Sequence, residues 1–185
     1  SSAASDVYKR QIIYRYQENR GVSSARNEGM RIARGELIAL LDSDDLWHAD
    51  KLERQLEIFD HYPEVCFLGT GYMDKPFRRK GRTITTLYKA DLWDIFWSFF
   101  PVTPSVMFKR EAIEKVGYFD ENQKYCEDIN YYIRFAVHFN YYYLPDKLVD
   151  IDIGKKYRGE KGLTSNLRGM HEGEMTNLKE MYEKR

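Results

Sequence analysis

A short, continuously apolar segment that stops at a cluster of acids constrains this sequence most. Residues Leu37–Leu41 (LIALL) show no polar alternation, which is typical of a strand buried on both faces of a parallel sheet. The segment ends abruptly at Asp42-Ser43-Asp44-Asp45. Ligands of open α/β sheets bind beyond the carboxyl ends of the strands, so these acids are predicted to face a crevice.

The acid cluster has two interpretations. Carboxylates this close together repel one another, and a divalent cation with a preference for hard oxygen ligands, Mg²⁺ or Mn²⁺, would relieve the repulsion. Alternatively, acids are favoured at the start of a helix, with Asp45 as the capping residue. Both can hold together. A calcium-binding EF-hand is excluded because Trp47 stands where that loop needs glycine.

The segments around this strand predict alternating strands and helices. Ile12–Tyr16 is a β-rich run, and Ser23 or Ser24 can cap a helix that ends near residue 33. The small residues expected to pack this helix closely on the sheet are Ala25, Gly29 and Ala33. The apolar side of a second helix, over residues 49–60, is predicted to be Leu52, Leu56 and Phe59.

The second half of the chain continues the alternation. Strands are predicted over residues 65–69, 83–88, 102–109, 141–144 and 148–153. Helices are predicted over residues 111–116, closed by Gly117, over 128–139, and from a cap at Asn166 to residue 182. His171 in this last helix is expected at the surface. The pattern as a whole indicates an α/β fold.

Charge and composition exclude several classes of protein. Lys plus Arg and Asp plus Glu are both 29, and this balance argues against a nucleic-acid partner, which requires a basic surplus. No stretch reaches the roughly 18 consecutive apolar residues of a membrane helix. Cys66 and Cys126 are interpreted as reduced thiols of a cytoplasmic protein. Residues 1–11 match no pattern that follows and are expected to be a non-native segment.

Two acids and an arginine mark another candidate site. Glu127-Asp128 opens a predicted helix, where acids also serve simply to stabilise the helix dipole. Arg134 could steer a phosphate or a carboxylate, or form a surface salt bridge. A basic run predicts a solvated hairpin tip or, as the second interpretation, a patch that faces anionic lipid or a lipid-diphosphate acceptor. It consists of Lys75, Arg78, Arg79, Lys80 and Arg82.

The order of these pieces resembles the inverting family-2 nucleotide-sugar glycosyltransferases of the GT-A fold. The first matching block, Asn19–Gln55 (NRGVSSARNEGMRIARGELIALLDSDDLWHADKLERQ), contains the pattern N-x-G-x-x-x-A-R-N-x-G, the buried strand and D-x-D-D. The second, Ser105–Phe135 (SVMFKREAIEKVGYFDENQKYCEDINYYIRF), resembles the G-x-F-D-E…E-D…R region of the family. The implied fold is a mostly parallel, Rossmann-like sheet flanked by helices.

The resemblance also implies a mechanism and its residues. A metal ion clamps the diphosphate of the nucleotide-sugar donor, and a carboxylate takes the proton from an attacking acceptor hydroxyl, with inversion at the sugar. The implied base is Asp128, with Glu127 and Arg134 as supporting residues. The implied metal ligands are Asp44, as the main one, and Asp42, which could instead contact ribose. The implied nucleotide contacts are Arg26, Asn27, Asp42 and Ser43.

Departures from the family pattern shape the remaining expectations. The opening strand with its P-x-Y-N motif and the D-D-G-S-x-D segment are absent, so residues 12–153 are expected to be a partial catalytic domain that is poorly stable and inactive alone. Residues 154–185 are expected to form a C-terminal loop and helix that pack on it or extend it. The Q-x-x-R-W motif of processive synthases is absent, which favours transfer of a single sugar.

Partners and alternatives complete the hypothesis. The expected acceptor is a cell-surface polysaccharide or a lipid-linked glycan, in the cytoplasm or peripherally at the inner face of the membrane. Two alternatives stay open. One is a nucleotidyltransferase that joins a sugar phosphate to a nucleotide. The other is a non-catalytic carbohydrate-binding domain that uses an aromatic surface, because 15% of the residues are aromatic.

Overall fold

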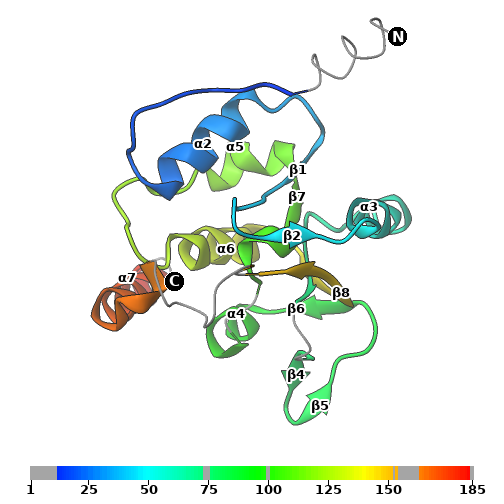
Figure 1. The fold of residues 1–185 in the computed structure, drawn as a ribbon. Helices are drawn as coiled ribbons and strands as arrows, with labels where there is room; N and C mark the ends of the chain where they lie inside the picture. The colour runs from blue at the N-terminus through cyan, green and yellow to red at the C-terminus, as the bar shows by residue number, and fades with distance from the viewer. Residues whose placement is uncertain (1–11, 73–75, 99–100, 152, 154–162, 184–185) are drawn as a thin grey trace, which may run out of the picture.

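A six-stranded sheet lies between helices in the computed structural model, which describes residues 12–72, 76–98, 101–151, 153 and 163–183 (Figure 1). The strands, in order across the sheet, are β1 (Leu37–Ala39), β7 (Met107–Lys109), β3 (Phe67–Tyr72), β8 (Tyr141–Asp150) and β2 (Leu46–Trp47), with β6 (Tyr88–Ala90) also on β8. The pair β3–β8 is parallel and the other pairs are antiparallel. The predicted α/β class is confirmed, but the sheet is mixed rather than mostly parallel.

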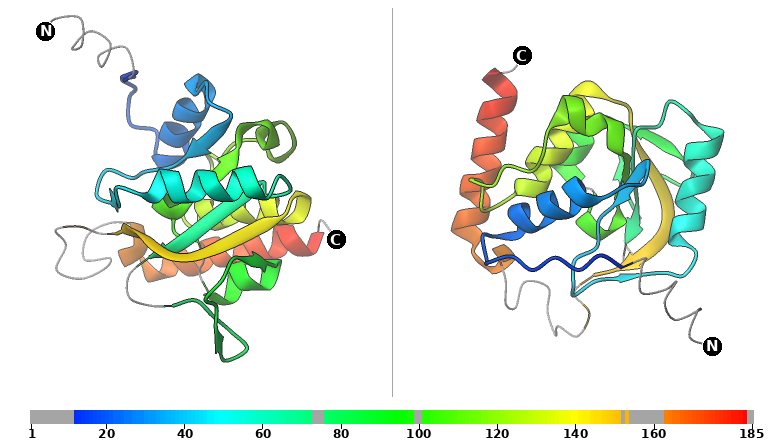
Figure 2. Two further views of the ribbon diagram at one scale, coloured as in Figure 1. Left: turned by 90° about the vertical axis from the view of Figure 1, so that its right-hand side faces the viewer. Right: turned by 90° about the horizontal axis from the view of Figure 1, so that it is seen from above.

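Helices cover both faces of this sheet (Figure 2). The helices are α2 (Val22–Ile32), α3 (Lys51–His61), α4 (Leu92–Ser98), α5 (Ile113–Val116), α6 (Glu127–His138) and α7 (Leu167–Glu183). Short 3₁₀ turns are η1 (Thr103–Ser105), η2 (Arg110–Ala112) and η3 (Leu163–Ser165). One face packs against α3 through Phe59, and the opposite face packs against α6 through Phe135. Helix α7 lies outside α6 (Figures 1 and 2).

Aromatic side chains form the centre of the larger core. The buried ring of Phe67 on β3 lies 4.8 Å from Phe135, 4.9 Å from Tyr141 and 5.3 Å from Tyr132, measured between ring centroids. Tilted pairs at such distances are favourable for aromatic rings. The aromatic content noted in the sequence therefore supplies an aromatic interior.

Two strand predictions for the part of the chain before the acid cluster are wrong. Ile12–Tyr16 lies outside any strand, and the side chains of Ile12, Tyr14 and Tyr16 are about 80% exposed. A β-rich composition makes a strand only where a neighbour completes the backbone ladder. The segment after Gly35 forms the three-residue strand β1, whose pairing with β7 is antiparallel, not parallel. Apolar continuity shows burial, but the direction of the neighbouring strand depends on the rest of the fold.

The face that α2 buries also differs from the prediction. Its buried residues are Ser23, Ser24, Asn27 and Met30. Ala25 and Gly29 are exposed, and a Cβ on Gly29 would meet no atom within 4 Å. Ala25 and Gly29 therefore do not pack on the sheet, whereas Ala33, at the C-cap of the helix, is partly buried against the larger core. The helix begins after Gly21, which has a φ of 89°, and neither serine caps it.

Helix α3 turns an unexpected side toward the sheet. It buries Lys51, Gln55 and Phe59, whereas Leu52 and Leu56 are more than 40% exposed. The residue at its N-cap position is Asp50, so the prediction that Asp45 caps this helix is wrong. The helical period of about 100° per residue is compatible with burial of either side of α3. The side that contains Gln55 is the buried one because Gln55 Nε2 donates hydrogen bonds to the carbonyls of Leu68 and Ser105.

Several local predictions are confirmed. Gly117, with a φ of 79°, ends α5, and the Asn166 side chain accepts a hydrogen bond from the Gly169 N–H at 3.0 Å, as an N-cap does. The two predicted strands after residue 140 form one long strand, β8. Cys66 and Cys126 are free thiols, and His171 is exposed. Among the described helices, none has the length and hydropathy needed to cross a bilayer.

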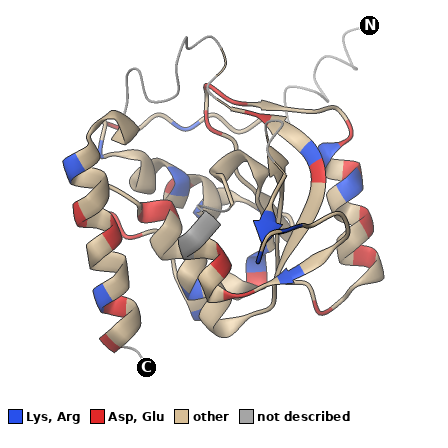
Figure 3. Cartoon of the chain, turned by 90° about the horizontal axis from the view of Figure 1, so that it is seen from below, with Lys and Arg blue, Asp and Glu red and all other residues tan. Residues whose placement is uncertain are grey.

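The described part of the basic run, residues 78–82, forms a hairpin, as predicted, and Lys75 lies outside the described residues. Strands β4 (Arg78–Arg79) and β5 (Arg82–Thr83) are joined through Lys80 and Gly81, both with positive φ, and Figure 3 shows the basic residues along it. Arg79 anchors the hairpin through ion pairs to Asp91 and Asp94. The other described cations of the hairpin are exposed to solvent.

Candidate active site

The acid cluster leaves the sheet at the end of β1 and turns at once. The Asp45 N–H donates to the Asp42 carbonyl at 3.2 Å, and the Asp44 carbonyl accepts from the Ile153 N–H at 2.9 Å. These bonds hold the turn beside the end of β8. As predicted from the sequence, the acids open toward a cavity.

This cavity has a volume of about 500 Å³ and is built from segments far apart in the sequence. Its residues include the acidic turn, the Pro101–Pro104 segment, the start of α6, and parts of η3 and α7. Asp44 and Asp128 both line it. The structure therefore brings together the two acids for which the family resemblance implies metal binding and proton transfer.

Arg26 connects the acids at the back of this cavity. Its Nη2 donates to both carboxylate oxygens of Asp42, at 2.8 and 3.1 Å, and its Nη1 donates to Glu127 Oε1 at 2.9 Å. The Arg26 side chain is only 11% exposed. Burial alone would lower the pKa of Arg26, but the neighbouring carboxylates, Asp42 foremost, outweigh it and raise that pKa. The guanidinium is thus a permanent positive charge inside the site.

The acids at the start of α6 hold their protons more tightly than ordinary carboxyls. Burial, and then the charge of Asp128, raise the pKa of Glu127 to about 7 despite the opposing effect of Arg26. Burial also raises the pKa of Asp128, again against Arg26. One oxygen of Asp128 accepts from the Ile129 N–H at 2.8 Å. A carboxylate with a raised pKa is a better proton acceptor, which suits a general base.

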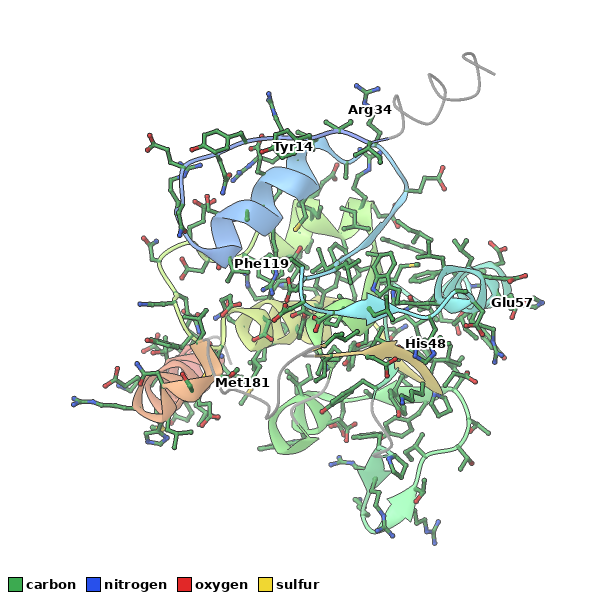
Figure 4. The ribbon with its side chains drawn as sticks, in the orientation of Figure 1. Tyr14, Arg34, His48, Glu57, Phe119 and Met181 are labelled. Atoms are coloured by element: carbon green, nitrogen blue, oxygen red, sulfur yellow. The ribbon has the colours of Figure 1, made fainter. Side chains whose placement is uncertain are left out.

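Two predicted site residues lie elsewhere. Asn27 is buried on the side of α2 toward Phe119, whose N–H it accepts and whose carbonyl it donates to, both at 2.9 Å. Figure 4 shows Phe119 between α2 and α6. Neighbouring positions on a helix face different directions, so Arg26 reaches the cavity and Asn27 does not. The expected contact of Asn27 with the nucleotide is therefore not supported.

Arg134 also has a structural role. It donates to the carbonyls of Val116 and Tyr118, both at 2.7 Å, and to Asn130 Oδ1 at 3.1 Å. These bonds satisfy carbonyls at the end of α5. Arg134 is not among the residues that line the cavity, so its role in steering a phosphate or supporting the base stays a prediction. Ser43, in contrast, lies on the cavity wall and is exposed.

The arrangement limits how a metal ion could be held. Both oxygens of Asp42 accept from Arg26, so an ion at Asp42 would share this carboxylate with the guanidinium, and metal binding by Asp42 stays a prediction. Within the described part of the chain, no group of three His, Cys, Asp or Glu residues could hold an ion. Asp44 at the rim still fits a Mg²⁺ ion, because this metal is typically held by one or two carboxylates together with substrate phosphates.

The Pro101–Pro104 wall was missed by the sequence analysis, which predicted a strand over residues 102–109, of which only Met107–Lys109 (β7) forms one. The turn η1 begins in this wall. Trp47 on β2 donates from Nε1 to the Pro104 carbonyl at 2.8 Å. Gln55 on α3 donates from Nε2 to the carbonyl of the next residue, Ser105, at 3.0 Å. Tyr132 donates to Thr103 Oγ1 at 3.1 Å. The two prolines of the segment were the available signal against a strand.

Comparison with known proteins supports the fold and the family of the chain. The fold matches that of a solved nucleotide-sugar complex, Staphylococcus aureus TarS 1–349 with UDP-GlcNAc, with a TM-score of 0.63 and 17% identity over 88% of this chain and 50% of that one. The fold is thus that of a GT-A glycosyltransferase, with an acidic cavity at the end of its sheet. The sequence profile of glycosyl transferase family 2 matches residues 2–117. The chain belongs to that family.

Relatives with curated names agree. An uncharacterized glycosyltransferase of Rickettsia typhi, RT0329, is 30% identical over 151 residues, which cover 69% of this chain and 43% of the relative. The minor teichoic acid biosynthesis protein GgaB of Bacillus subtilis is 44% identical over 126 residues, covering 65% of this chain and 14% of that protein. The chain therefore spans less than half the length of these relatives.

Proposed function

We propose that this chain carries the donor site and the catalytic base of an enzyme that transfers a single sugar, with inversion, from a nucleotide-diphosphate sugar to a hydroxyl acceptor. The observation that carries the proposal is the cavity shared by Asp44 and Asp128. Membership of a glycosyltransferase family favours this function over a nucleotidyltransferase or a non-catalytic sugar-binding domain.

The chemistry follows from the roles of the cavity residues. The acceptor oxygen forms a bond to the anomeric carbon while the bond from that carbon to the diphosphate oxygen breaks, and Asp128 takes the hydroxyl proton. Attack from the face opposite to the leaving group gives inversion. Arg26 supplies a fixed positive charge near the acids, and its guanidinium pairs with both Asp42 and Glu127. A Mg²⁺ or Mn²⁺ ion held by Asp44 and the donor phosphates would neutralise charge on the departing diphosphate.

The substrates are proposed from the relatives. The complex of TarS with UDP-GlcNAc supports a nucleotide-sugar donor, and the name of GgaB, a minor teichoic acid biosynthesis protein, supports an acceptor of the teichoic acid type. We also propose a cytoplasmic location, at the inner face of the membrane when the acceptor is lipid-linked. The free thiols Cys66 and Cys126 are in keeping with a reducing compartment.

The substitution Asp128→Asn tests the proposal. The assay is nucleotide release from UDP-N-acetylglucosamine and other UDP-sugars, with a panel of glycan acceptors, in the longest native reading frame that carries this sequence. Loss of the base should lower transfer about 10²- to 10⁴-fold and leave donor binding intact. Glu57→Gln, an exposed acid on the outer side of α3, is the matched control (Figure 4). Undiminished transfer by Asp128→Asn would refute the proposed base.

A further inference from the structure

Helix α7 packs tightly against the loop that leads into the start of α6. Two of its glycines make this contact possible: a Cβ on Gly169 would lie 2.5 Å from the Tyr125 ring, and one on Gly173 would lie 2.4 Å from the Tyr125 carbonyl oxygen. Both glycines are buried. The Tyr125 hydroxyl also accepts from the Asn166 side chain at 2.8 Å. The backbone of the loop is therefore held directly by α7.

At the centre of this contact is Asn177, which is only 1% exposed. Its Nδ2 donates to the Cys126 carbonyl at 3.0 Å, and its Oδ1 accepts from Gln123 Nε2 at 2.8 Å and Asn130 Nδ2 at 3.2 Å. Both ends of the amide are thus used, on partners before and inside α6. A buried amide that is hydrogen-bonded at both its nitrogen and its oxygen favours one arrangement, because each lost bond leaves a desolvated polar group.

The carbonyl that Asn177 holds belongs to the residue immediately before the two site acids. Cys126 is the N-cap residue of α6 and has a φ of 55°, a left-handed conformation that is uncommon for residues other than glycine. Its carbonyl also accepts from Gln123 Nε2 at 3.2 Å, and its thiol donates to the Met170 carbonyl at 3.4 Å. Contacts with the 123–125 loop and with α7 thus hold a backbone turn that is unfavourable alone.

We propose that Asn177 is a positioning residue for sugar transfer, which holds the turn at Cys126 and so directs Glu127 and Asp128 into the cavity. This inference rests on the proposed function, since it assigns to Asn177 the placement of the proposed base. The cavity itself supports the link, because Leu163, Thr164 and Met170 from the same C-terminal segment form part of its wall. Docking of α7 thus determines both the direction of the acids and the shape of the cavity.

The main test is Asn177→Ala, measured as UDP release from UDP-N-acetylglucosamine with the glycan acceptors, in the same native reading frame. A displacement of a catalytic group by about 1 Å can cost about 100-fold in rate, so we expect kcat to fall at least about tenfold. The KM for the donor should change less than about threefold. The midpoint of the pH–kcat profile should also move, because the surroundings of the acids change.

Thr176→Ala is the matched control, since Thr176 is the exposed neighbour of Asn177 on α7 and its hydroxyl donates within the same helix, to the Glu172 carbonyl at 2.9 Å. We expect the kcat and pH profile of this variant to stay within about twofold and 0.2 pH units of the wild type. If Asn177→Ala leaves kcat and the pH profile unchanged, or if Thr176→Ala reproduces its effects, the positioning role is refuted.

A second measurement does not depend on activity. The rate at which Cys126 reacts with a thiol reagent, with the modified site identified by mass spectrometry, reports on how firmly α7 covers the turn. Burial, and then the charge of Asp128, raise the pKa of this thiol to about 12, so the native protein should react slowly. Asn177→Ala should accelerate labelling of Cys126 at least about tenfold and leave buried Cys66 unchanged. Unaltered labelling of Cys126 would overturn the inference, even if Asp128→Asn confirms the proposed function.

Discussion

Lys51 offers the sharpest test of the energetics of this fold. Its side chain is completely buried at the start of α3, where Nζ donates to Gln55 Oε1 at 2.7 Å and lies 4.2 Å from the centroid of the Trp47 ring. Lys51 takes part in none of the ion pairs found among the described residues. Burial of the ammonium without a carboxylate lowers the pKa of Lys51 from 10.5 to about 7.

The sign of the pH dependence follows from this lowered pKa. Below pH 7 both the folded and the unfolded chain hold the Lys51 proton, and the folded state bears the full cost of a buried charge. Between pH 7 and 10.5 the unfolded chain binds more protons, so the free energy of unfolding rises with pH. At 1.36 kcal/mol per pH unit, the contribution is about −5 kcal/mol at pH 6 and about −1 kcal/mol at pH 10.

The substitution Lys51→Met shortens the side chain by one heavy atom and removes the charge. It also removes the bond to Gln55, which is worth about 1–2 kcal/mol. The cation–π contact with Trp47 requires a charged Lys51, so it is already part of the balance that sets the pKa and is absent from the folded wild type at pH 10. We therefore expect the variant to be more stable than the wild type by about 3–4 kcal/mol at pH 6 and less stable by at most about 1 kcal/mol at pH 10.

Urea unfolding followed by circular dichroism at the two pH values measures this difference. Comparison with the wild type at each pH cancels groups that titrate in both proteins. Lys179→Met, at an exposed lysine of α7, is the control and should change stability equally at both pH values. A difference between Lys51→Met and the wild type that is the same at pH 6 and pH 10 would refute the reasoning.

Two further substitutions test the site and the docking of α7. A lysine in the Arg26→Lys variant cannot reach Asp42 and Glu127 together, so the free energy of unfolding in urea should fall by about 2–4 kcal/mol. The control Arg31→Lys, at an exposed arginine of the same helix, should change it by less than about 0.5 kcal/mol. Equal effects of the two substitutions would contradict the role of Arg26. Gly173→Ala should lower the free energy of unfolding by at least about 2 kcal/mol, because the added Cβ meets the Tyr125 carbonyl. The control Gly29→Ala, at a position with no atom within 4 Å, should raise it by about 0.5–1 kcal/mol. An unchanged stability of Gly173→Ala would show that α7 docks differently.

Local rules made much of the chain predictable from its sequence. The α/β class, the cap at Asn166, the stop at Gly117 and the basic hairpin all depend on residues within a few positions of one another. The same is true of the acidic turn after β1 and of the acids that open α6. Because a strand end and a helix start are both local features, the sequence located the two halves of the candidate site without showing that they meet.

Only the tertiary structure decided which side chains meet. It joined Asp44 and Asp128 in one cavity, engaged Asp42 with Arg26, and turned Asn27 and Arg134 toward backbone carbonyls elsewhere. Partners so distant along the chain leave no periodic signal, because their choice depends on how whole helices pack on the sheet. The direction of β1 and the buried polar face of α3 were settled in the same way, by strands and carbonyl groups far along the sequence.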